Sequence, residues 1–112
     1  MKTTTILLLT LSALGASVGQ VLFKVGATGR TTPLEFVNPY IVGGGILYAT
    51  ATSVWIYALA HEKLVNVYAF TALTFVFVYI GGVVLLRESL STPAAFGVGL
   101  VLVGLYLVTS NG

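Results

Sequence analysis

The chain has 112 residues, of which 57% are hydrophobic and 7% charged, with a formal net charge of +2. Soluble domains carry about 25% charged residues, so this composition excludes an ordinary water-soluble fold. Cysteine is absent, which excludes disulfides and thiolate metal ligands. The few positive charges are spread over separate segments, so we expect no nucleic-acid partner.

The charged residues gather in short segments and leave four uncharged stretches, which are residues 3–23, 36–60, 64–86 and 89–112. A bilayer core about 30 Å thick needs roughly 20 apolar residues of helix. Barrel strands are shorter and alternate in polarity. We therefore predict an all-α membrane protein, a bundle of four transmembrane helices in one domain over residues 1–112, in the cell (inner) membrane.

The first helix is expected over residues 4–25, ending where Gly26 and Gly29 supply breakers before Pro33. A signal peptide is the alternative for this segment. Its usual apolar region has about 7–15 residues, which is shorter than the uncharged run here.

One face of the first helix is polar, because its polar and small residues recur at spacings of three and four. These residues are Thr10, Ala13, Ser17, Gln20 and Lys24. We expect this face to look inward, since hydrocarbon cannot satisfy the amide of Gln20. The alternatives are structural hydrogen bonding for Gln20 and snorkelling of Lys24 to the headgroups.

The second helix is expected over residues 39–59 with Pro39 in its first turn, and Gly45, Tyr48, Thr52 and Trp55 share one of its faces. Residues 61–63 form a short turn into the third helix.

The third helix is expected over residues 64–86 and carries Tyr68 and Thr71 on one stripe. The alternative for Tyr57, Tyr68 and Tyr106 is an interfacial aromatic belt. The fourth helix, over residues 93–108, follows a turn in which Ser91 or Thr92 can cap it.

Small residues recur at helical spacing and allow close approach of helices in lipid. They are Gly15 and Gly19 in the first helix, Gly45, Ala49 and Ser53 in the second, and Gly97 and Gly104 in the fourth. We expect packing within the bundle for the first two sets, and either packing or a dimer seam for the fourth helix.

Four spans place both ends of the chain on one side, with Lys2 and Lys63, while Lys24, Arg30 and Arg87 lie opposite. Two positive charges against three barely specify an orientation. This balance either is an accident of a charge-poor chain or permits insertion in both orientations and an antiparallel dimer.

No group of residues predicts catalysis, because the chain has one His, no Cys and no carboxylate within a span. We therefore expect neither enzymatic activity nor a metal or cofactor. His61 beside Glu62 is expected to lie in a solvated loop.

Three segments resemble the drug/metabolite transporter superfamily in its short four-helix form. Residues 19–24 (GQVLFK) are similar to its first-helix signature, and residues 67–69 (VYA) to the opening of its third helix. Residues 86–91 (LRESLS), followed by Pro93 and the 97–104 glycine pattern, resemble its junction between the third and fourth helices.

The resemblance implies a transporter that pairs with a second copy of itself or with a homologous four-helix subunit. Small multidrug resistance members carry an acidic first-helix residue that binds cations and protons, and this chain has Ala16 at that position. Without an embedded carboxylate a cation lacks a counter-charge. Other short relatives flip aminoarabinose-charged polyprenyl phosphate, and a phosphate would suit Lys24 and Gln20.

We therefore expect a dimeric transporter, or a flippase of lipid-linked sugars, that favours a neutral or anionic substrate and touches membrane lipid. The candidate substrate-binding residues are Ser17, Gln20, Lys24, Tyr48, Tyr68 and Thr71. Two alternatives remain, a cation exporter that uses Glu62 or Glu88 and a non-transporting assembly subunit.

Overall fold

The computed structural model describes residues 2–111, and every regular element in that range is helical. The elements are α1 (Thr3–Ala27), the 3₁₀ turn η1 (Pro33–Phe36), α2 (Pro39–Leu59), α3 (Leu64–Ala69), α4 (Thr71–Val84) and α5 (Thr92–Asn111). Four stretches of helix are long and apolar enough to cross a membrane, with α3 and α4 together forming the third. The all-α prediction is confirmed, and so is the prediction of four helices with the length and apolarity of membrane spans.

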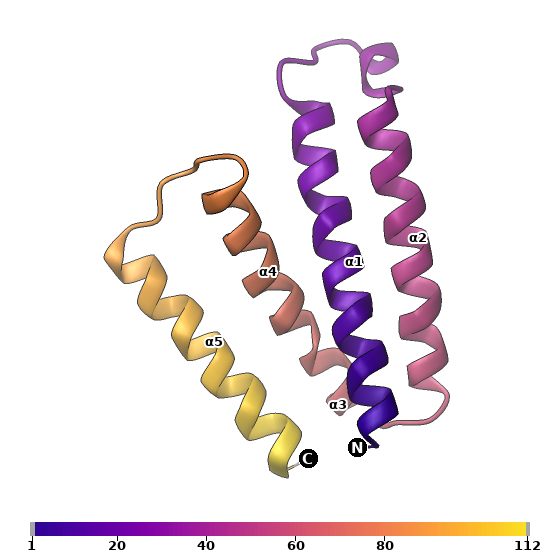
Figure 1. Cartoon of the computed structure of the whole chain (residues 1–112), viewed down its shortest axis with the longest axis vertical. Helices are drawn as coiled ribbons and strands as arrows, with labels where there is room; N and C mark the ends of the chain where they lie inside the picture. Colours follow the sequence, from indigo (N-terminus) through magenta and orange to yellow (C-terminus); the bar gives the residue numbers. More distant parts are fainter. Residues whose placement is uncertain (1, 112) are drawn as a thin grey trace.

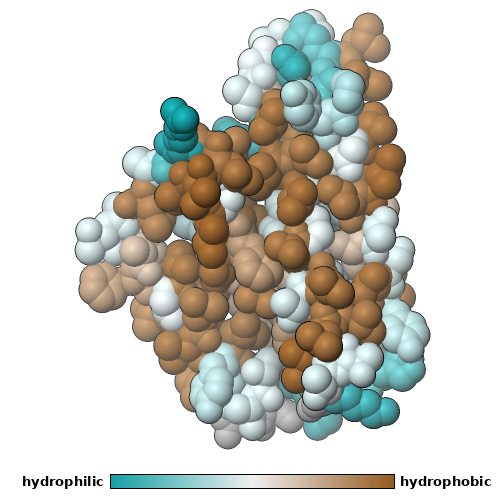
Figure 2. Space-filling model, viewed as in Figure 1, coloured by the Kyte–Doolittle hydropathy of each residue, from teal (hydrophilic) through white to brown (hydrophobic). Residues whose placement is uncertain are grey.

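The four spans form a flattened layer rather than a closed bundle. The molecule measures 46 × 35 × 18 Å, and α2, α1, α4 and α5 follow one another across its width (Figure 1). α1 packs on α2 and α4, whereas α5 packs on α3 and α4. Apolar residues cover the middle of the face seen in Figure 2 and polar residues gather toward its two ends, as expected for a layer that crosses a bilayer.

α1 and α2 approach closely along a seam of small residues. A Cβ atom added to Gly19 would lie 2.9 Å from the carbonyl oxygen of Gly44, and one added to Gly44 would lie 2.9 Å from that of Gly19. Lower in the seam, the Ser12 hydroxyl donates a 2.7 Å hydrogen bond to the Ala51 carbonyl. Close backbone approach of this kind is how helices associate in lipid.

The α2 side of this seam differs from the prediction. Gly44, Ala51 and Ala58 are buried, whereas Ala49 and Ser53 are exposed and a Cβ added to Gly45 would meet nothing within 4 Å. The predicted face was therefore wrong, because at 100° per residue the two sets point about 160° apart and the seam uses nearly the opposite side of the helix. Gly15 and Gly19 do pack on α2, while added Cβ atoms at Gly97 and Gly104 would meet nothing within 4 Å among the described residues.

Asn38 joins the upper ends of α1 and α2. Its Oδ1 accepts from the N–H groups of Tyr40 (3.1 Å) and Ile41 (3.2 Å), which caps α2, and Pro39 occupies the first turn as predicted. Its Nδ2 donates to the carbonyls of Gly26 and Glu35, both at 3.0 Å. One side chain thus fixes the end of α1, the connecting loop and the start of α2.

The lower end of the layer is closed by an apolar cluster where α1, α2 and α3 meet. Its buried members are Leu9, Ala58, Val67 and Phe70. Just after this cluster, the span predicted as one helix over residues 64–86 is interrupted at Phe70, which separates α3 from α4. The Phe70 N–H bonds to the Val67 carbonyl and the Leu73 N–H to the Phe70 carbonyl, both at 3.1 Å, so bonds of three-residue spacing interrupt the four-residue ladder.

Candidate functional site

A cavity lies directly above the apolar cluster, between α1, α2 and the α3–α4 break. Its volume is about 410 Å³, within the usual range of roughly 300–1,000 Å³ for small-molecule sites. Its lining residues are Leu9, Ser12, Ala13, Ala16, Tyr48, Ala51, Thr52, Trp55, Tyr68, Phe70, Thr71 and Thr74. The cavity extends from the middle of α2, at Tyr48 and Thr52, down to Leu9 and Tyr68 in the lower part of the layer.

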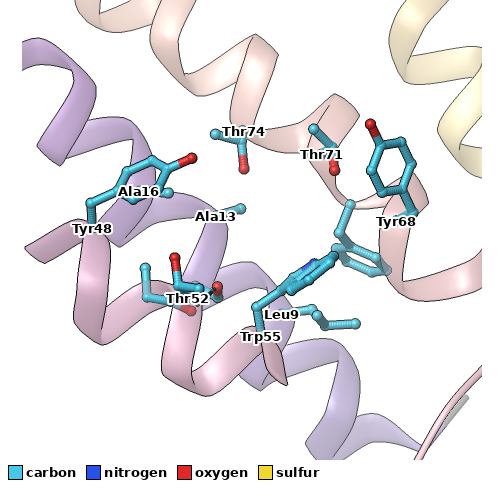
Figure 3. A pocket seen from close by; sticks show the side chains of 12 residues that line it. Leu9, Ala13, Ala16, Tyr48, Thr52, Trp55, Tyr68, Thr71 and Thr74 are labelled. Atoms are coloured by element: carbon cyan, nitrogen blue, oxygen red, sulfur yellow. Dashed lines mark hydrogen bonds between the residues drawn. The ribbon is translucent and has the colours of Figure 1, made fainter. Parts of the chain in front are cut away.

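The cavity offers hydroxyl groups and aromatic rings. Figure 3 shows Thr52, Thr74 and Tyr48 directed into it, with the Trp55 ring between α2 and the α3–α4 break. The Ser12 hydroxyl is already engaged by the Ala51 carbonyl at 2.7 Å. Within residues 2–111, no hydrogen bond engages the hydroxyls of Tyr48, Thr52, Tyr68, Thr71 or Thr74, so these groups can bond to a bound molecule.

No acidic or basic side chain lines the cavity. Ala16, the position at which the transporter resemblance would put an acid, is among its lining residues. An ion entering this site would lose hydration without meeting an opposite charge, which is costly in a low-dielectric setting. The lining therefore favours an uncharged group that carries hydrogen-bonding atoms and can pack against aromatic rings.

Three of the six predicted binding residues line this cavity, namely Tyr48, Tyr68 and Thr71. Ser17 does not, because it is buried with 3% of its surface exposed, and its hydroxyl donates to the Leu14 carbonyl at 2.7 Å. Gln20 and Lys24 are exposed and lie outside the lining. They stand four and eight residues after Ala16, so they occupy the cavity-lining face of α1 above the cavity.

The expected inward polar face of α1 is thus buried only in its lower part. Ala13 and Ser17 are buried, whereas Gln20 and Lys24 are not covered by another helix of this chain. The physical reason is that α2 and α4, which lie on either side of α1, move apart above the cavity (Figure 1), although α4 stays in contact with α1 as far as Gly81.

A second pocket of about 440 Å³ lies between α1 and α4 and is almost entirely apolar. Ser17 is its one hydroxyl-bearing residue, and Gly81 approaches Val21 so closely that an added Cβ would lie 2.9 Å from the valine Cγ2. Exposed Val18 and Val84 border it, so this groove faces the acyl chains of the bilayer.

Several lining residues were not among the predicted binding residues, including Ser12, Ala16, Phe70 and Thr74. Ser12 could have been found from a seven-residue repeat of small residues, Thr5, Ser12, Gly19 and Gly26, all of which are buried. Nothing in the sequence marks Phe70, because it is neither Pro nor Gly. Within residues 2–111 no three His, Cys, Asp or Glu side chains gather that could hold a metal ion.

Comparisons with protein-family models, with curated proteins and with solved structures found no match to this chain.

Proposed function

We propose that this chain is one half of a small dimeric transporter of the cell (inner) membrane, working by alternating access on a small solute. The solute is neutral, or anionic with its charge held at exposed Lys24, outside the uncharged cavity. The observation that carries the proposal is a cavity that reaches the middle of the membrane-spanning layer, with free hydroxyls and aromatic rings and no charge. A structural subunit has no need of such a cavity, whereas transporters bind their substrates near the midplane.

The third span also has a local irregularity in the cavity wall. Phe70 keeps helical φ and ψ values of −69° and −10°, but the hydrogen bonds there tighten to three-residue spacing, and such a tightened turn within a helix often marks a functional hinge. Here the break at Phe70 lies beside Tyr68 and Thr71 in the cavity wall. A change of angle at this break would change access to the cavity.

A dimer is proposed because one copy leaves two surfaces uncovered, the open side of the cavity and the apolar face of α5. The cavity is open on one side, since Tyr48 and Tyr68 are 40% and 62% exposed. None of the apolar window of α5 is buried within the chain. A second copy in the opposite orientation, or a homologous four-helix subunit, would cover both, and the near balance of positive charges permits either orientation.

The test uses Trp55, the single tryptophan of the chain, which lines the cavity and therefore reports its occupancy by fluorescence. Phenyl glucoside serves as a neutral probe, phenyl phosphate as an anion and tetraphenylphosphonium as a cation. We expect one of the first two to change Trp55 emission and to enter proteoliposomes faster than protein-free liposomes.

The adjacent variants Thr52→Val and Ser53→Ala form a matched pair for this assay. Thr52 lines the cavity, whereas Ser53 is exposed and its hydroxyl donates to the Ala49 carbonyl of its own helix at 2.9 Å. We expect binding about three- to tenfold weaker for Thr52→Val and unchanged for Ser53→Ala. Strong uptake of tetraphenylphosphonium or quaternary ammonium ions, with none of the other probes, would overturn the proposal.

A cation exporter is the second candidate, and the aromatic rings of Tyr48, Trp55 and Tyr68 favour it because such rings attract cations. It requires an acid from a loop, so cation uptake would be lost in Glu88→Gln or Glu62→Gln. If neither Trp55 emission nor uptake responds to any probe, an assembly subunit that binds a larger complex through α5 becomes the better explanation.

A further inference from the structure

Two polar residues of α1, Gln20 and Lys24, stand above the cavity on the helix face that lines it. Gln20 follows Ala16 by four residues and Lys24 follows Ala13 by eleven, and each of these spacings returns to the same face of a helix. Both side chains are exposed. A solute reaching the cavity from the end of the α1–α2 loop therefore passes them.

Glu88 is brought back over the upper part of α4 by a reversal of the chain after this helix. Arg87 has a φ of 56°, a left-handed conformation that turns the backbone back toward the helix. The Glu88 N–H then bonds to the Gly82 carbonyl at 3.0 Å. The carboxylate lies over Gly82 so closely that a Cβ added there would be 2.7 Å from Glu88 Oε1.

Gly82 stands on the cavity-lining face of α4, because it follows the lining residue Thr71 by eleven residues, or about three turns. Its depth is fixed by the contact between α1 and α4, in which a Cβ added to Gly81 would lie 2.9 Å from Val21 Cγ2. α1 and α4 run in the same direction (Figure 1). Gly82, and the carboxylate over it, is therefore level with Leu22, between Gln20 and Lys24.

These three side chains, Gln20, Lys24 and Glu88, form what we call the charged mouth. It presents one positive and one negative group at one depth, above a cavity that has no charge. A lone anion near Lys24 would also meet the Glu88 carboxylate, and a lone cation near Glu88 would also meet the Lys24 ammonium. A ligand with both charges satisfies both groups and leaves none desolvated and unpaired.

We infer that the charged mouth recognises a zwitterion, specifically an α-amino acid with an uncharged side chain. The carboxylate pairs with the Lys24 ammonium and accepts from the Gln20 amide, and the α-ammonium pairs with the Glu88 carboxylate. The side chain enters the upper part of the cavity, toward Tyr48. This inference rests on the proposed function and names the substrate class of the same site.

The test compares four molecules that share a phenylethyl group, each titrated against the full chain in nanodiscs by calorimetry and by Trp55 emission. L-phenylalanine carries both charges, phenethylamine the ammonium, 3-phenylpropionate the carboxylate, and 2-phenylethanol neither. All absorb at shorter wavelengths than tryptophan, so Trp55 can be excited alone. We expect L-phenylalanine to bind about tenfold or more tighter than each single-charge analogue, the effect of one charge-assisted hydrogen bond.

The variants assign each charge to its partner. In Lys24→Gln, L-phenylalanine should bind no more tightly than phenethylamine, which lacks the carboxylate. In Glu88→Gln, it should bind no more tightly than 3-phenylpropionate, which lacks the ammonium. Gly82→Ala should act like a weaker Glu88→Gln, because its new Cβ displaces the end of a flexible side chain and not the backbone. Lys63→Gln, at the opposite end of the molecule, is the control and should leave all four affinities unchanged.

Equal affinity for L-phenylalanine and phenethylamine would overturn the inference, as would a Lys24→Gln variant that binds all four molecules like the wild type. The second result is also expected if Lys24 and Glu88 only pair with each other. Binding of 2-phenylethanol without any preference for the zwitterion would remove the amino-acid assignment and leave the proposed function standing. Failure of all four molecules, together with failure of the probes above, would remove both.

Discussion

Substituting alanine at the adjacent glycines of α2 tests the seam that positions the cavity wall. At Gly44 the new Cβ would lie 2.9 Å from the Gly19 carbonyl oxygen, and at Gly45 it would meet nothing within 4 Å. Alanine favours a helix over glycine by about 1 kcal/mol. Gly45→Ala should therefore raise the free energy of unfolding by up to about 1 kcal/mol.

At Gly44 the same gain is opposed by overpacking, which costs about 1–3 kcal/mol in a tight interior. The opposing atom belongs to the α1 backbone and cannot rotate away, so we expect the full cost and a net loss of up to about 2 kcal/mol. Pushing α1 from α2 also strains the Ser12–Ala51 hydrogen bond of 2.7 Å in the cavity wall. Gly44→Ala should therefore weaken ligand binding as well.

The assay is reversible unfolding in mixed micelles, followed by far-ultraviolet circular dichroism and by Trp55 emission. The two variants differ by one position on one helix, so propensity, hydrophobicity and expression effects are matched. Stability changes of the same sign and similar size in both variants would refute the seam, because only close contact with α1 distinguishes the two positions.

Asn38→Ala should lower the free energy of unfolding by about 2–4 kcal/mol, since it removes a helix cap and two further hydrogen bonds. Asn38→Asp should lower it by about half as much, because the aspartate keeps the cap. Equal losses for the two variants in the same micelle assay would argue against the Nδ2 contacts. Arg87→Gly should stabilise the chain by about 1 kcal/mol, because a φ of 56° costs a residue with a Cβ roughly that amount, and a lower midpoint would contradict the left-handed turn. Ala16→Glu should bind tetraphenylphosphonium at least about tenfold more tightly than the wild type does, because a carboxylate in the cavity wall supplies a counter-charge. If titration of this variant leaves Trp55 emission unchanged, residue 16 does not lie in the cavity wall.

The starts of α2 and α5 could be predicted to within one residue because their signals are local, whereas α1 passes through the expected breaker Gly26 to Ala27 and α5 runs to Asn111 instead of residue 108. Charged segments separate the spans, Pro39 lies in the first turn of α2, and Ser91 caps α5 through a 3.3 Å bond from the Ala94 N–H, as expected. The interruption at Phe70 has no such signal. It arises where α3 packs into the apolar cluster while α4 follows α1, so it depends on tertiary contacts.

The face of α2 that packs on α1 could not be predicted from the sequence of α2 alone. The buried residues of α2 repeat every seven residues, at Gly44, Ala51 and Ala58. The small residues at 45, 49 and 53 repeat every four, which is equally regular within one helix. Only pairing with the seven-residue repeat of α1 selects the first set, because two helices that stay in contact must share a period.

Of three residues predicted to line one inward site, Tyr48 lines the cavity, whereas Gln20 and Lys24 lie outside it. Face and depth follow from the sequence for all three. Exposure depends on whether a neighbouring helix continues alongside, and α4 diverges from α2 above the cavity (Figure 1). The predicted face of α1 is therefore a cavity wall in its lower half and an open approach to the cavity in its upper half.

This divergence bears on how a molecule of this size would work. A flattened layer 18 Å thick is too thin to enclose a cavity of about 410 Å³ on all sides, since one helix with its side chains is already about 10–12 Å across. The open side lies where Tyr68 is 62% exposed, and the uncovered face of α5 lies beyond it. Transport by alternating access requires that the site be closed to one side of the membrane at a time. On the proposed function, the closing surface must therefore come from a second four-helix unit, so each half of the dimer supplies a wall to the other half's cavity. Crosslinking that held two copies together while leaving Trp55 accessible to aqueous quenchers from both sides would contradict this arrangement.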